Sequence, residues 1–77
     1  MTSRDSNYVI LFKAVSYALK AEKILKQEDL PYKLIPVPKQ ISSDCGVCLL
    51  VRPDVKEKIE TALLNKVEIE EIRALDN

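Results

Sequence analysis

The fold is decided by two short apolar runs, Tyr8-Val9-Ile10-Leu11-Phe12 and Val47-Cys48-Leu49-Leu50-Val51. Both are rich in β-branched, aliphatic or aromatic residues, and both are apolar at odd and at even positions. Successive residues of a strand point to opposite faces of a sheet, so such a run is typical of a strand that is buried on both faces. The sequence therefore predicts two central strands.

Two further segments have the features of edge strands. Residues 32–38 include Pro36 and Pro38, which cannot donate a hydrogen bond to a neighbouring strand. Near the end of the chain, three apolar residues alternate with glutamates, which suits a strand with one solvated face. These apolar residues are Val67, Ile69 and Ile72.

Helical spacing occupies the segments between the predicted strands. In the first helix we expect Ser16 to cap the amino end and Pro31 to stop the chain from continuing as helix. Its apolar face comprises Val15, Ala18, Leu19, Ala21, Ile24 and Leu25. The second helix opens at Pro53-Asp54, and Asp54 and Glu57 have the spacing of an acidic relative of the capping box. Its buried stripe comprises Val55, Ile59, Ala62 and Leu63.

The predicted order is β-α-β-β-α-β, which indicates an α+β protein with a ferredoxin-like antiparallel sheet. With two central and two edge strands, the strand order is 4-1-3-2 and both helices lie on one face. We expect residues 1–77 to form a single small domain, with residues 1–6 as a disordered tail. The uncovered face would then be apolar, so we expect a homodimer or a protein partner there. The alternative is a terminal segment that folds over this face.

Composition excludes several classes of function. The 77 residues carry 12 basic and 12 acidic groups, and this zero balance argues against a nucleic-acid partner. The apolar runs are too short to span a membrane, and the polar start has no signal-peptide pattern. We therefore expect a cytoplasmic protein whose two cysteines are thiols.

The two cysteines, Cys45 and Cys48, allow four interpretations. Zinc needs four ligands, and with no histidine the chain could supply them only as a dimer. A redox couple has the right spacing, but residues three apart in an extended strand cannot form a disulfide unless the chain turns there. A lone reactive thiol at Cys45 fits best, since turn formers precede it and Gly46 follows it. In the fourth interpretation both cysteines are inert.

Topology gives the reactive-thiol interpretation a location. The loop after the second strand lies at the same end of the sheet as the start of the first helix, so Cys45 should lie near that helix terminus. Helix amino ends and ammonium groups both stabilise a thiolate. The reacting group is predicted to be Cys45, with Gly46 and Asp44 beside it, and Cys48 is a possible resolving thiol. The surrounding binding residues are Ser42, Ser43, Lys39 and Lys13. No metal and no cofactor is expected.

A resemblance rests on Leu34-Ile35-Pro36-Val37-Pro38-Lys39 followed by Ile41-Ser42-Ser43-Asp44-Cys45-Gly46. Together with Phe12 and the segment 18–25, these residues resemble a family of small bacterial proteins described as putative selenium/sulfur carrier protein-like. The resemblance implies that Cys45 holds sulfur or selenium as a persulfide or selenopersulfide. It also implies donor and acceptor proteins as partners. The chain lacks the Cys-Pro-x-Pro motif of better-known sulfur-transfer proteins.

A second class of function stays open at this point. Ferredoxin-like domains often act as interaction or regulatory modules, and a fold alone does not assign a function. Under that interpretation the sheet face binds a partner and Cys45 has no chemical role. Of the two kinds of chemistry that a reactive Cys45 could serve, we expect a carrier protein rather than a stand-alone enzyme.

Overall fold

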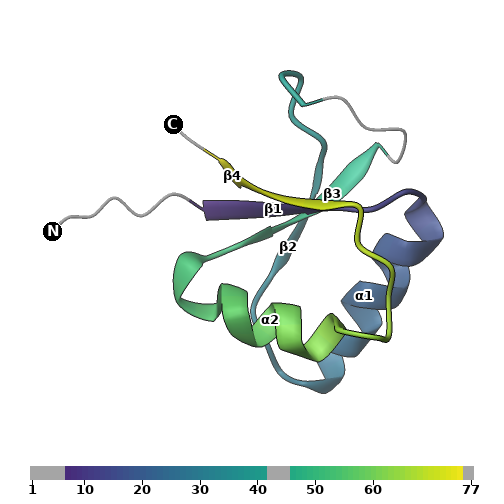
Figure 1. The fold of residues 1–77 in the computed structure, drawn as a ribbon, viewed down its shortest axis with the longest axis vertical. Helices are drawn as coiled ribbons and strands as arrows, with labels where there is room; N and C mark the ends of the chain where they lie inside the picture. The colour runs from purple at the N-terminus through teal and green to yellow at the C-terminus, as the bar shows by residue number, and fades with distance from the viewer. Residues whose placement is uncertain (1–6, 42–45, 76–77) are drawn as a thin grey trace, which may run out of the picture.

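The structure is a computed structural model, and it describes residues 7–41 and 46–75. The described chain forms β1 (Asn7–Leu11), α1 (Val15–Gln27), β2 (Lys33–Pro36), β3 (Val47–Val51), a short 3-10 turn (Pro53–Val55), α2 (Lys56–Leu63) and β4 (Glu71–Leu75). All neighbouring strands are antiparallel, and the sheet order is β2-β3-β1-β4. The predicted α+β class and strand order are therefore confirmed. Both helices lie on one side of the sheet (Figure 1).

The first hydrophobic core lies between the sheet and the helices. Ile10 and Leu49 face each other across β1 and β3, and both are fully buried. The helices cover them with Ala18, Ala21, Leu25, Ile59 and Leu63. The small side chains of Ala18 and Ala21 allow α1 to approach the sheet closely. This core depends on the apolar periodicity that the sequence shows.

The second face of the sheet is also closed, which corrects the expectation of an exposed apolar patch. Val9, Leu11 and Cys48 are buried on this face together with Ile41, which follows β2. Val37 packs against the same cluster. The segment after β2 rises on the side opposite the helices and supplies this cover (Figure 1). The argument for a homodimer through an uncovered face therefore loses its premise.

The beginning of α1 differs from the prediction. The helix begins at Val15 with Ala14 as its N-cap residue, and no side chain caps it. Phe12 is fully buried, and it turns the chain towards the helix layer directly after β1. Ser16 therefore lies inside the first turn and does not cap the helix.

The beginning of α2 differs too. Asp54 lies in the 3-10 turn, and α2 has Val55 as its N-cap residue with no side-chain cap. The Arg52 guanidinium donates two hydrogen bonds to the Asp54 carboxylate, at 3.0 Å and 2.6 Å. This pairing lowers the pKa of Asp54. The predicted capping box with Glu57 does not form, because Arg52 holds the carboxylate.

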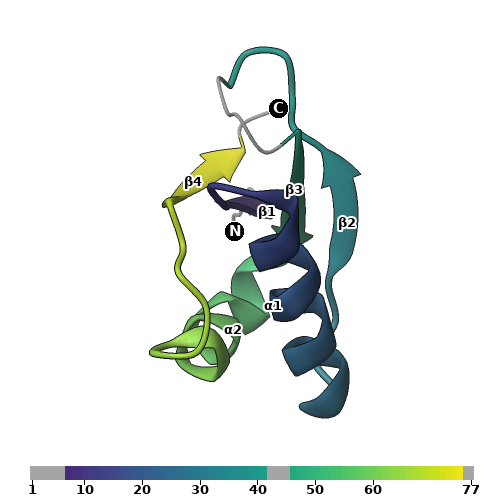
Figure 2. The same cartoon turned by 90° about the vertical axis from the view of Figure 1, so that its right-hand side faces the viewer.

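The last strand begins later in the sequence than expected. Val67 is buried, but its N–H donates to the carbonyl of Leu63 at 3.1 Å, which ties it to the end of α2. Asn65 adopts a left-handed conformation with φ 64° and turns the chain there. The connection then climbs from the helix layer to the sheet (Figure 2). Residues 66–70 are used for this climb, so β4 comprises Glu71–Leu75.

The predicted edge position of β2 is confirmed, although the strand is shorter than residues 32–38. Val37 donates its N–H inward to Gly46, at 3.1 Å. Alternate residues of an edge strand direct their amides towards the neighbouring strand, so Pro36 and Pro38 fall at outward positions. The missing donors therefore face away from β3, where they discourage another strand from pairing. Within the described ranges, neither helix has the length and hydrophobicity to cross a membrane.

Candidate functional site: the loop between β2 and β3

The predicted reactive residues lie in the loop that joins β2 to β3. Four of them, Ser42, Ser43, Asp44 and Cys45, are outside the described residues. The structure does describe both ends of the loop, the strands that carry it and the side chains beneath it. These parts define where the predicted cysteine is attached to the fold.

Two backbone hydrogen bonds fix the described ends of the loop. The N–H of Val37 donates to the carbonyl of Gly46, at 3.1 Å, and so extends the pairing of β2 with β3 by one step. The N–H of Ile41 donates to the carbonyl of Pro38, at 3.0 Å, and closes a turn over Lys39 and Gln40. Residues 38–41, which lead from β2 into the loop, therefore form a defined turn.

Gly46 joins the loop to β3 in a conformation that favours glycine. Its φ is +85°, and a Cβ placed there would meet nothing within 4 Å. Backbone strain, and not a clash, therefore selects glycine at this position.

Cys48 is a buried residue of the second face. It lies on β3 between Leu11 of β1 and Ile35 of β2, and its exposure is 0%. Ile41, from the loop itself, packs in the same cluster. This position agrees with the interpretation of Cys48 as a small core residue. Its role as a resolving thiol stays a prediction.

The start of α1 lies at the loop end of the sheet, as predicted from topology. β1 and β2 are both antiparallel to β3, so both strands end on the same side. The first turn of α1 carries no acidic residue and no side-chain cap. Its N–H groups therefore give this end of the molecule a partial positive charge.

The two predicted lysines differ in their surroundings. Lys13 forms an ion pair with Glu68, with 3.2 Å between Nζ and Oε2, and both side chains are largely exposed. Glu68 therefore already balances part of the Lys13 charge. Lys39 is exposed in the turn that leads towards Cys45. The contribution of either lysine to a thiolate stays a prediction.

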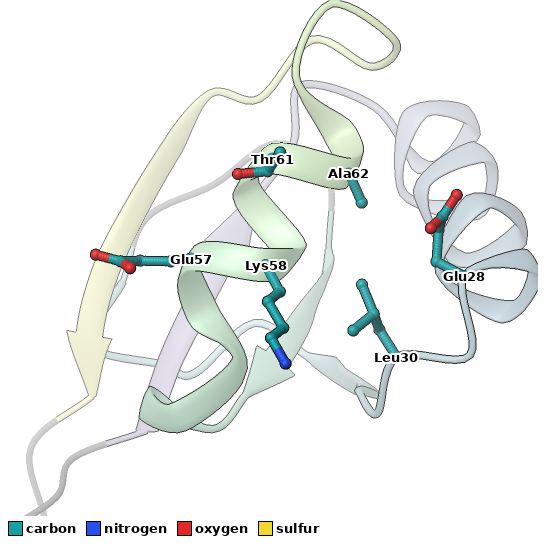
Figure 3. Close-up of a pocket in the computed structure, with 6 residues that line it drawn as sticks. All are labelled: Glu28, Leu30, Glu57, Lys58, Thr61 and Ala62. Atoms are coloured by element: carbon teal, nitrogen blue, oxygen red, sulfur yellow. The ribbon is translucent and has the colours of Figure 1, made fainter.

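A separate hollow of about 460 Å³ lies between the end of α1 and α2, at the other end of α1 from the loop (Figure 3). It is lined by Glu28, Leu30, Glu57, Lys58, Thr61 and Ala62. The side chains of Glu57 and Lys58 point in different directions, so the polar groups do not converge on one point. In the described part of the chain, no three His, Cys, Asp or Glu residues are grouped to hold a metal. The hollow offers no reactive arrangement.

Comparison with known proteins identifies the family. The family model described as "Putative Se/S carrier protein-like" matches residues 7–73, which is most of the chain. The chain belongs to this family. Comparisons with curated proteins and with solved structures gave no significant match.

The anchoring of the loop to the sheet was not predicted from the sequence. Ile41 and Val37 anchor the loop to the second face of the sheet. The available signal was a single large apolar residue, Ile41, between the polar segments 38–40 and 42–46. An isolated apolar residue in a polar loop is a weak pattern, because exposed apolar residues are common.

Proposed function

We propose that this protein carries sulfur or selenium on Cys45 and passes it between partner proteins. The observation that carries the proposal is the family match over residues 7–73, because the family is described as carriers of these two elements. Of the two cysteines, Cys48 is buried among apolar side chains, which makes Cys45 the candidate acceptor. We place the reaction in the cytoplasm, where thiols stay reduced.

The proposed loading step is an attack by the Cys45 thiolate on the terminal sulfur of a donor persulfide. A bond forms between the Cys45 sulfur and the terminal sulfur. The sulfur–sulfur bond of the donor breaks, and the donor cysteine leaves as a thiolate. Electrons balance without an added oxidant. Unloading repeats the step with an acceptor thiolate or another nucleophile. A selenopersulfide would form in the same way.

Surrounding groups have supporting roles in this proposal. The uncapped amino end of α1 and the exposed Lys39 favour an anion at this end of the molecule. Lys13 would contribute less, because Glu68 is its ion-pair partner. Ser42, Ser43 and Asp44 would shape the turn that presents Cys45, and Gly46 would let a partner approach closely. The element order and sheet order support a ferredoxin-like fold as the scaffold.

The test is intact-mass analysis after incubation with inorganic polysulfide, followed by peptide mapping with and without reductant. We expect a gain of one sulfur atom on the Cys45 peptide, and we expect the reductant to remove it. Cys45→Ser should fold normally and gain nothing, whereas the control Cys48→Ala should still be loaded. Equal loading of wild type and Cys45→Ser would overturn the proposal. A Cys45–Cys48 disulfide in place of the persulfide would favour the redox couple.

A further inference from the structure

An apolar strip lies exposed along the side of α1 that is next to β2. It consists of Val15, Leu19 and Leu34, whose exposed fractions are 45%, 49% and 37%. Val15 and Leu19 are four residues apart, so they share one side of the helix. Both belong to the broad apolar face that helical spacing predicts for α1. The structure instead buries Ala18, Ala21 and Leu25 and leaves these two in solvent.

Tyr32 and Glu22 indicate which side of α1 faces β2. Burial, and then the Glu22 carboxylate of α1, raise the pKa of the Tyr32 hydroxyl directly before β2, so these two side chains are neighbours. Leu19 is three residues from Glu22 and Val15 is seven, so both lie on the Glu22 side of the helix. Figure 2 shows α1 beside β2, whereas α2 lies on the β4 side.

Leu34 continues the strip on β2 itself. It is paired with Leu49, which is buried beneath the helices, so Leu34 points to the helix side of the sheet. The helix α1 runs antiparallel to β2. Moving along α1 from Glu22 back to Val15 therefore follows the same direction as moving along the chain from Tyr32 to Pro36. The three apolar side chains therefore follow one line, and this line ends where β2 enters the loop of Cys45. By contrast, Leu64 is exposed by 65% at the end of α2, away from this strip.

The charges beside the strip are mostly positive. On the Leu19 side of α1 the charged residues are Glu22, Lys23 and Lys26, so ammonium groups outnumber carboxylates there. Lys33 is paired with Leu50 of the second face, so it points away from the helix side and does not border the strip. A twofold dimer brings the same surface of both copies together, so self-association here would place lysines against lysines. A partner with carboxylates around an apolar centre suits this surface better.

We propose that Val15, Leu19 and Leu34 form the docking surface for the protein that donates sulfur to Cys45, and that this donor presents an apolar patch with an acidic rim. The inference rests on the proposed carrier function. The outward positions of Pro36 and Pro38 discourage strand addition at this edge, so the partner binds through side chains. Val15 opens α1 at the end of the sheet where β2 leads into the loop, so a donor docked on the strip lies at that end of the molecule.

The experiment compares two sulfur sources with three proteins. The proteins are the wild type, Leu19→Asp and the control Leu64→Asp, which places the same charge at an exposed apolar residue outside the strip. One source is inorganic polysulfide, which needs no docking. The other is a cysteine desulfurase with L-cysteine as its substrate. Each desulfurase of the source organism is tested in turn, at a substoichiometric amount of enzyme. The readout is the initial rate of sulfur gain on the Cys45 peptide, with circular dichroism to verify folding.

We expect Leu19→Asp to be loaded by the desulfurase about tenfold more slowly than the wild type, while Leu64→Asp changes less than twofold. Polysulfide should load all three equally. Lys23→Glu should slow the enzymatic reaction several-fold and reduce its dependence on salt, unlike the control Lys58→Glu on α2. Enzymatic loading of Leu19→Asp at the wild-type rate would overturn the proposal. Loading of the wild type by polysulfide but by no desulfurase would also overturn it and leave the carrier function standing. Loading by neither source would reject both.

Discussion

The helix-covered face of the sheet and the loop-covered face bury their central side chains equally well, but they do so with different parts of the chain. On the first face, two helices cover Ile10 and Leu49. On the second, Val37 and Ile41 close over Val9, Leu11 and Cys48. The second face therefore depends on the same segment that carries the proposed reactive cysteine. On the helix side, the residues that stabilise the core are separate from the proposed reactive segment. On the loop side, the same segment contributes to both.

This coupling has a consequence for a small domain. A 77-residue domain has a limited core, so each buried contact is a sizeable part of its stability. Ile41 contributes to the core and also fixes the end of the turn that leads from β2 into the loop. Because the anchor is two side chains and not a helix, we expect the cover to open at a lower cost in free energy than the helix-side core.

The largest effect is expected on the helix side. Leu49→Ala should lower the free energy of unfolding by about 3–4 kcal/mol, because Leu49 is fully buried between the sheet and both helices. Urea denaturation followed by circular dichroism measures this loss. The control Leu64→Ala, at an exposed residue, should change stability by less than about 0.5 kcal/mol. Similar losses in the two variants would mean that Leu49 is not central to the core.

A smaller loss with a distinct signature is expected on the loop side. Ile41→Ala should cost about 2 kcal/mol, since the flanking loop can partly collapse into the space. In a Cys45→Ser background, the rate at which iodoacetamide alkylates Cys48 reports whether this cover is closed. Cys48 should react faster in Ile41→Ala than in Leu49→Ala, although Leu49→Ala is the less stable protein. The opposite order would show that Cys48 is reached only by global unfolding, and that Ile41 is not its local cover.

The same contrast explains what the sequence could predict. The central strands were predictable because Ile10, Leu49 and their neighbours form short runs that are apolar at both odd and even positions, and the prolines marked β2 as an edge. The cover of the second face was not predictable, because it depends on where Ile41 falls after a turn. Val15 and Leu19 were misassigned for a related reason: periodicity gives the width of an apolar stripe, but the position of α1 near the sheet edge decides how much of it is buried.

The candidate site divides in the same way. The cysteine, the turn formers and Gly46 could be recognised from residue type and order, and topology placed the loop beside the amino end of α1. Side-chain pairings at long range were missed. Lys13 was assigned to the thiolate, but its ion pair is with Glu68, which is 55 residues away in the sequence (68 − 13). Local patterns do not encode such a pairing, because it depends on how the α2–β4 connection climbs to the sheet.

The smallest effect concerns the polar contact that holds α1 against β2. Burial, together with the hydrogen bond to Glu22, raises the pKa of the Tyr32 hydroxyl above its ordinary value of 10.0. A raised pKa means that the folded state holds this proton more tightly than the unfolded state. The stabilisation is therefore complete below about pH 10 and is lost as the pH rises through the folded-state pKa.

Tyr32→Phe should cost about 1 kcal/mol at pH 7 and progressively less at higher pH. Urea denaturation at a series of pH values from 7 to 11 measures the free energy of unfolding of the wild type and of Tyr32→Phe. Tyr17→Phe, at an exposed tyrosine, is the matched control. If the difference between wild type and Tyr32→Phe stayed constant over this range, the contact with Glu22 would not be what raises the pKa of Tyr32 or fastens this side of the helix layer.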